Sequence, residues 1–202
     1  FDLHETITAG TIDTNAVDHF LRAPGDGIAV FDDRDNVLLH EPPSALEIPS
    51  RLDAMCRFAN EEAPGVFLHP VLKAIILHFW LAYDHPFIDG NGRTARALFY
   101  WSMLRQGFWL FEFVSISRIL RDAPARYGRS FLYTETDEND LTYFILAQLE
   151  VLKRSIDELR SYQDWFLRYQ LRAVPGVAEV APIGGFVRQY QVNIDPVKLQ
   201  AY

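Results

Sequence analysis

The sequence predicts a mainly α-helical protein, a helical bundle that carries one small β-hairpin and ends in a β-prone tail. Three observations support this fold class. A long apolar stretch with helical character covers residues 69–87. Two short β-prone runs flank a polar turn early in the chain, and the residues after Val174 are rich in valine and glycine. With 202 residues, 49% of them hydrophobic, the chain can fold around one real core.

The first half of the chain contains helix and hairpin signals in a clear order. Residues 3–22 are predicted to form one or two helices. Strands are predicted at residues 28–31 and 37–40, around the turn sequence DDRDN, and a proline pair then ends the second strand. Helical spacing returns at residues 44–62, with the apolar side chains on one side.

The most apolar helix is predicted to begin at Pro70, a residue that suits a first helical turn. Apolar residues lie on nearly every face of this helix, which indicates a central, buried helix. A second helix should begin near Asn91 and end at Gly107, where glycine favours helix termination.

The second half of the chain continues with helices and then changes character. Residues 115–134 are predicted to form several short helices, and residues 139–174 are predicted to form a long helical region. The tail reads as a strand, a glycine turn and a second strand at residues 186–194.

Charge and cysteine content narrow the function classes. The net charge of −8 argues against duplex nucleic acid as the main partner, although a local cationic pocket could still bind a nucleotide. Cys56 is the only cysteine, so an internal disulfide is excluded and a reducing compartment fits. There is no signal stretch and no apolar run of membrane-spanning length, so we expect a cytoplasmic protein.

The stretch HPFIDGNGRTAR, residues 85–96, places polar chemistry between the two most apolar helices. A glycine-rich turn that opens a helix directs free backbone N–H groups and partial positive charge outward. Arg93 and Arg96 follow on the first turn, an unfavourable place for cations unless a polyanion binds there. Asp89 is a hard oxygen ligand suited to Mg²⁺, and His85 can take up a proton near neutral pH. Together these groups indicate phosphoryl or nucleotidyl transfer.

A purely structural interpretation of the stretch is also available. In it, the turn is buried, Asp89 pairs with Arg93, and His85 is a satisfied core histidine. The concentration of all these groups within twelve residues favours the functional interpretation. We expect His69 and His78, in contrast, to cap or pack rather than to bind zinc.

HPFIDGNGRTAR fits the signature H-P-F-x-[D/E]-G-N-G-R-x-x-R of the Fic family in full, and residues 1–160 as a whole resemble that family. The resemblance implies a Fic-fold catalytic domain with a flap at about residues 28–40. It also implies a nucleotidyltransferase that moves AMP from ATP, with Mg²⁺, to a Ser, Thr or Tyr hydroxyl of a target protein. The same resemblance leaves open removal of AMP or transfer of another phosphate-linked group, self-modification and a homodimer. A non-catalytic interaction module is the rival from another class.

The resemblance also implies a role for each motif position. His85 would be the base that deprotonates the target hydroxyl, Phe87 the core anchor of the loop, and Asp89 the Mg²⁺ ligand. The residues implied to bind the phosphate chain are Gly90, Asn91, Gly92, Arg93 and Arg96. The flap residues implied to bind a target segment by strand addition are Val37, Leu38, Leu39 and His40.

Many Fic proteins are inhibited by a glutamate in the pattern [S/T]-x-x-x-E-[G/N]. No such segment precedes the hairpin, and we would expect it upstream of Phe1. Glu138, in TETDEN, matches the short pattern formally. We interpret it as part of a polar loop that caps the next helix through Asn139 or Asp140.

Residues 161–202 resemble a different family, the periplasmic porter region of RND-type heavy-metal efflux pumps. The runs VPGVAEV, IGGFVRQYQV and DPVKLQAY carry this resemblance. By itself the segment can carry no transport. A gene fusion, a cloning or assembly artefact and a misjudged Fic C-terminus are the three explanations, of which we favour a fusion.

Overall fold

A computed structural model describes residues 1–11, 21–31, 38–60 and 67–180. The later part of the predicted N-terminal helices, the hairpin turn with Val37 and the second strand predicted in the tail lie outside the described residues. The first strand predicted in the tail is described only as far as residue 180, and residues 175–180 form no strand. The chain divides into two compact units, Phe1–Val151 and Leu152–Tyr202.

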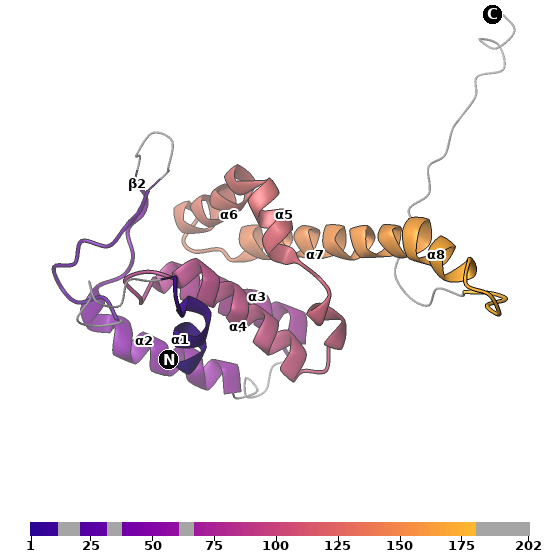
Figure 1. The fold of residues 1–202 in the computed structure, drawn as a ribbon. Coiled ribbons are helices and arrows are strands. Elements are labelled where there is room, and N and C mark those ends of the chain that lie inside the picture. The colour runs from indigo at the N-terminus through magenta and orange to yellow at the C-terminus, as the bar shows by residue number, and fades with distance from the viewer. Residues whose placement is uncertain (12–20, 32–37, 61–66, 181–202) are drawn as a thin grey trace, which may run out of the picture. The chain divides into compact units, whose positions relative to one another are not determined.

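In its described residues the first unit is mainly helical with one two-stranded antiparallel sheet, so the predicted fold class is confirmed (Figure 1). The sheet pairs Val30 with His40 and Phe31 with Leu38. In chain order the elements are α1 (Asp2–Thr8), β1 (Val30–Phe31), β2 (Leu38–His40), η1 (Ala45–Glu47), α2 (Ile48–Asn60), α3 (Pro70–Asp84), α4 (Asn91–Arg105), η2 (Trp109–Glu112), α5 (Ile116–Asp122), α6 (Pro124–Thr136) and α7 (Thr142–Tyr162).

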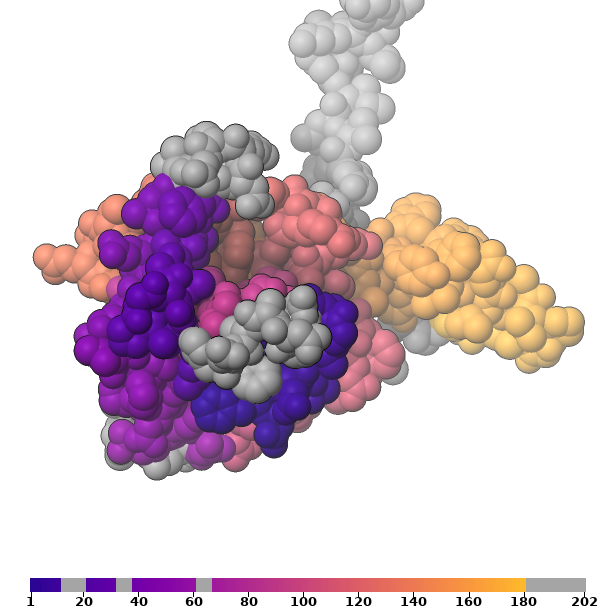
Figure 2. Space-filling view, turned by 60° about the vertical axis from the view of Figure 1, so that its left-hand side comes forward, coloured from indigo at the N-terminus to yellow at the C-terminus, as the bar shows by residue number. Residues whose placement is uncertain are grey.

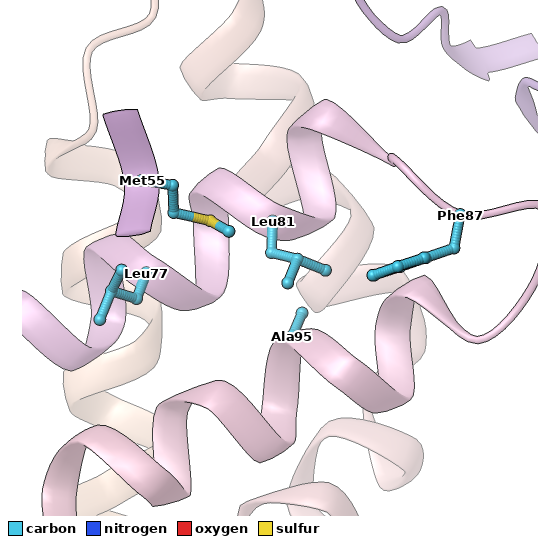
Figure 3. Packing of buried hydrophobic residues seen from close by; sticks show 5 residues of the cluster. All are labelled: Met55, Leu77, Leu81, Phe87 and Ala95. Atoms are coloured by element: carbon cyan, nitrogen blue, oxygen red, sulfur yellow. The ribbon is translucent and has the colours of Figure 1, made fainter. Parts of the chain in front are cut away.

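Helices α3 and α4 pack against each other at the centre of the first unit. Figure 3 shows one core cluster, in which Leu77 and Leu81 of α3 meet Ala95 of α4, Met55 of α2 and Phe87 of the connecting turn. Each fully buried leucine contributes about 1.5–3 kcal/mol of transfer free energy. Because the turn between α3 and α4 supplies Phe87 to this cluster, core packing and the polar motif are coupled.

An aromatic cluster joins α3 to α6 and to the first part of α7. The ring centroids of Phe79 and Phe131 are 5.2 Å apart, and those of Phe131 and Phe144 are 4.7 Å apart. The rings of Phe79 and Phe144 meet edge to face at 5.1 Å. A helix that packs on several sides must be apolar all round, which is the pattern that the sequence shows for α3.

Helix ends follow their local sequence signals. The Nδ1 atom of His69 accepts a hydrogen bond from the N–H of Val71 at 3.2 Å, so this histidine is a cap as expected. Gly107, just after α4, has a φ of +85°, which glycine adopts without strain. Asp140 caps α7, since its Oδ1 accepts from the N–H of Thr142 at 2.9 Å.

The second unit begins within α7 and continues the long helical region predicted at residues 139–174. A π-helical turn (Gln163–Leu167) leads into α8 (Arg168–Arg172). No helix in the part of the chain that the structure describes is both long and apolar enough to cross a membrane.

Candidate active site

The motif turn connects the end of α3 to the start of α4. His85 is the C-cap of α3 and adopts a left-handed conformation, with φ 46° and ψ 54°, while its N–H still bonds to Leu81 O at 3.1 Å. A residue with a Cβ is strained in this region, so the surrounding structure must hold His85 there. Figure 2 shows the α3–α4 region reaching the surface between the indigo N-terminal segment and the purple segment that contains β2.

The imidazole of His85 is partly buried and neutral at neutral pH. Its Nδ1 lies 3.2 Å from Ala82 O, so we assign the ring proton to Nδ1 and leave Nε2 as an acceptor. Burial lowers the pKa of His85, and the positive charges of His40 and Arg22 act in the same direction. A neutral imidazole with an unprotonated Nε2 can accept a proton from a hydroxyl.

Reciprocal hydrogen bonds between Phe87 and Asn91, and the packing of Phe87, stabilise the turn. The N–H of Phe87 donates to Asn91 Oδ1 at 2.9 Å, and Asn91 Nδ2 donates back to Phe87 O at 2.7 Å. Phe87 is buried, pairs with Leu21 through a β-bridge and stacks on His4 at 3.8 Å. The amide of Asn91 therefore bonds to the turn itself, and what it offers a ligand is its backbone N–H.

The glycine that opens α4 has no room for a side chain. Gly90 has a φ of +83°, and a Cβ there would lie 2.6 Å from Cγ2 of Thr8 and 3.1 Å from Nε2 of His4. Nε2 of His4 is also 2.9 Å from the carbonyl oxygen of Asp89. Helix α1 thus packs directly on the motif turn. The sequence motif gave no sign of these contacts, because they come from residues more than 80 positions away.

Asp89 is exposed and pairs with Arg93, with Oδ2 and Nη2 3.1 Å apart. Arg93 also donates to Thr11 Oγ1. The Asp89–Arg93 pair of the structural interpretation does form, but at the surface rather than in a buried turn. Among the described residues, no group of three or more His, Cys, Asp or Glu side chains could hold a metal ion. A single exposed carboxylate fits Mg²⁺ that takes its other ligands from phosphates and water.

The two motif arginines, Arg93 and Arg96, interact with different residues. Whereas Arg93 reaches Asp89, Arg96 interacts electrostatically with the hydroxyl of Tyr127 on α6. That hydroxyl lies 3.0 Å from Nε2 of His78.

Burial accounts for the protonation states of His78 and Tyr127. Burial lowers the pKa of His78 to about 3 and raises that of Tyr127 to about 12, so both stay neutral at pH 7. The structure agrees with the packing role expected for His78. Tyr127 was not predicted, and no pattern around it in the sequence points to Arg96.

The predicted flap residues separate into two groups. Leu38 and Leu39 are exposed on β2, whereas His40 is buried. Nε2 of His40 donates to Tyr83 O at 2.7 Å, and its Nδ1 lies 2.9 Å from Oε1 of Glu135. Its imidazole therefore joins the base of the hairpin to α3 and α6 instead of facing outward. Glu138 lies in the exposed turn between α6 and α7, with a φ of 52°.

The sequence model of the Fic/DOC family matches residues 1–103, and the chain belongs to this family. Among solved structures, the chain resembles a Fic family protein from Desulfovibrio desulfuricans G20. That match has a TM-score of 0.64 and 25% identity, and it covers 87% of this chain and 52% of the other.

Curated relatives include proteins named protein adenylyltransferase Fic. The one from Nematostella vectensis is 39% identical over 69 residues, which is 34% of this chain and 16% of the relative. The one from Drosophila yakuba is 39% identical over 69 residues, or 14% of the relative. The chain thus matches only a small part of these longer proteins.

The resemblance to efflux proteins is also confirmed. The cation efflux system protein CusA from Escherichia coli (strain K12) is 56% identical over 50 residues, which is 25% of this chain and 5% of the relative. Protein HelA from Legionella pneumophila is 40% identical over 75 residues, or 6% of the relative. Each match covers a small fraction of a much larger protein.

Proposed function

We propose that the protein is a protein adenylyltransferase that moves AMP from ATP to a Ser, Thr or Tyr hydroxyl of a target protein. The observation that carries the proposal is the neutral, partly buried imidazole of His85, which directly precedes a glycine turn at the start of a helix. Such a turn binds anions through its N–H groups, and Arg93 and Arg96 add positive charge beside it. The names of the adenylyltransferase relatives support the same activity.

The proposed reaction is a single displacement at the α-phosphorus. Nε2 of His85 takes the proton of the target hydroxyl, whose oxygen attacks the α-phosphorus while pyrophosphate leaves. The N–H groups at Gly90, Asn91 and Gly92 would bind phosphate oxygens and orient the chain for attack. For this, the N–H of Gly90 would have to release Oδ1 of Asp89, to which it donates in the structure. In this proposal Phe87 anchors the turn in the core while these groups hold the nucleotide.

The charged residues have to exchange partners when the nucleotide binds. Asp89 would hold Mg²⁺, an ion that neutralises charge on the phosphates when it is bound. In the structure Asp89 instead pairs with Arg93 at an exposed site, where ion pairs contribute little. Mg-ATP can therefore separate the pair at low cost, which frees Arg93 for the phosphate chain.

A target segment would add to the exposed part of the hairpin. The side chains of Leu38 and Leu39 are exposed on β2, and a short two-stranded sheet offers free strand edges for pairing. Val37, which lies outside the described residues, belongs to the same proposed surface. His40 would not contact the target segment; it would hold the hairpin in place through its contacts with Tyr83 of α3 and Glu135 of α6.

We also propose that residues 1–160 form the catalytic domain and residues 161–202 an appended segment. Limited proteolysis tests this boundary. Cleavage between Leu159 and Pro175, with labelling activity retained by the larger fragment, is the expected result. Loss of all activity on such cleavage would contradict the boundary.

The proposed adenylyl transfer can be tested by comparing ATP labelled at the α-phosphorus with ATP labelled at the γ-phosphorus. A lysate incubated with the protein, Mg²⁺ and ATP labelled at the α-phosphorus should yield labelled proteins, whereas ATP labelled at the γ-phosphorus should not. His85→Ala should abolish labelling while Mg-ATP binding persists. Labelling from the γ-position would instead indicate a different phosphate-group transfer. Absence of Mg-ATP binding by calorimetry would favour the interaction module.

A further inference from the structure

One buried arginine, outside the motif, contacts the backbone of the motif turn at several points. Nε of Arg22 donates to His85 O at 2.8 Å, and its Nη2 donates to Asp84 O at 3.0 Å and to Pro43 O. The backbone N–H of Arg22 donates to Pro86 O at 2.9 Å. A single residue thus bonds to three successive carbonyls of the turn.

Helix geometry explains why a guanidinium fits there. The last carbonyls of α3 lack helical partners and carry partial negative charge, so a cation at this end is favourable. The planar fork of arginine can donate to several carbonyls in a fixed arrangement. Arg22 as a whole is only 8% exposed, and the carboxylate of Asp84, itself 2.7 Å from Arg51, provides the nearby negative charge.

The contact matters because His85 is held in a strained conformation. A left-handed residue with a Cβ costs about 1 kcal/mol or more relative to ordinary backbone, so the chain leaves that conformation unless it is held. The orientation of the His85 carbonyl depends on the ψ angle of His85. A donor fixed on that oxygen therefore fixes the backbone from which the imidazole projects.

We propose that Arg22 is a positioning residue that holds the backbone of His85 in its left-handed conformation and thereby aims the imidazole at the reacting hydroxyl. The catalytic part of this inference rests on the proposed adenylyl transfer. Arg22 makes no proposed contact with the nucleotide, so it acts through His85. A general structural role, through its bond to Pro43 O, is the alternative.

The experiment compares Arg22→Met and Arg22→Lys in the full chain, with Arg57→Met as the matched control. Arg57 is an exposed arginine on α2 that pairs only with Asp53 in the contacts described for it. For each folded variant, the rate of label transfer from α-labelled ATP into a fixed lysate is measured against ATP concentration. Amide hydrogen exchange at His85, whose N–H bonds to Leu81 O, gives a readout that needs no activity.

For Arg22→Met we expect kcat to fall by about 30- to 100-fold, as for other misplaced catalytic groups, while the KM for ATP changes less than about twofold. Exchange at His85 should rise by about tenfold or more. Arg22→Lys should fall between Arg22→Met and the wild type, because an ammonium group cannot reproduce the fork. Arg57→Met should match the wild type.

Unchanged kcat or unchanged exchange at His85 would overturn the inference, as would equal losses of kcat and ATP affinity. If Arg22→Met does not fold, Arg22→Lys decides by the same criteria. If the wild type transfers no label, the proposed function fails, but exchange at His85 still tests the backbone role of Arg22.

Discussion

The Nδ1 atom of His40 lies 2.9 Å from Oε1 of Glu135, which joins the β-hairpin to α6. On its own, burial would lower the pKa of His40. The ion pair with Glu135 and the hydrogen bond to the carbonyl of Tyr83 outweigh burial, so the pKa of His40 is raised. The protonated imidazole can donate from both ring nitrogens at once.

This pair predicts a pH-dependent contribution to stability. A histidine whose folded pKa is raised contributes stability that is fully present below its unfolded pKa of about 6.5. The contribution disappears as the pH rises through the folded value. Glu135→Gln should therefore lower the free energy of unfolding by about 1 kcal/mol at pH 6, and by less at pH 8. Urea denaturation at both pH values measures this, and a loss that is equal or larger at pH 8 would contradict it.

His78 predicts pH dependence of the opposite sign. Burial lowers its pKa to about 3, so the unfolded chain takes up a proton that the folded protein does not. Below pH 6.5, unfolding should become easier by about 1.4 kcal/mol per pH unit, with His85 acting in the same direction. His78→Leu should remove the larger part of this slope between pH 6.5 and 5, measured by urea denaturation. An unchanged slope in His78→Leu would refute the assignment.

Tyr127→Phe tests the partner of Arg96. Loss of the hydroxyl removes the group with which Arg96 interacts, so we expect Mg-ATP to bind about 5- to 30-fold more weakly. The rate at saturating ATP should change less, because His85 is untouched. Calorimetry with Mg-ATP measures the affinity, and Tyr143→Phe, at an exposed tyrosine that bonds to Asp137, is the matched control. Equal affinities of Tyr127→Phe and wild type would show that Arg96 needs no such partner.

Gly90→Ala tests the close packing of α1 on the turn. The new Cβ would be both strained by the positive φ and 2.6 Å from Thr8 Cγ2, so we expect a loss of about 2–4 kcal/mol in stability. Gly128→Ala, within α6, has open space around its Cβ and should instead stabilise by about 0.5–1 kcal/mol. Thermal unfolding of both variants measures the contrast. A fully stable Gly90→Ala protein would mean that α1 does not pack on the motif.

Asp89→Asn tests the proposed Mg²⁺ ligand. An amide is a weaker ligand than a carboxylate, so the Mg²⁺ concentration for half-maximal labelling should rise by about tenfold. Stability should change little, because the lost pair with Arg93 is exposed. A magnesium titration of label transfer measures this. Superimposable titrations of variant and wild type would rule out Asp89 as the ligand.

The sequence by itself determined the features that depend on neighbouring residues. The apolar pattern and Pro70 define α3, Gly107 marks the end of α4, and the candidate site is recognisable because its motif is contiguous from His85 to Arg96. Helix periodicity, caps and turns act over a few positions along the chain, so a single sequence reveals them.

Only the tertiary structure decided which distant side chains hold the site together. His4, Arg22 and Tyr127 meet the motif from positions far along the chain, and His40, predicted as part of the target-binding flap, is buried against α3 and α6. The physical reason is that such contacts depend on how helices pack against one another, and no local spacing encodes that packing. The motif thus specifies which groups are present, whereas the fold around it fixes the backbone of His85 and the separate partners of Arg93 and Arg96.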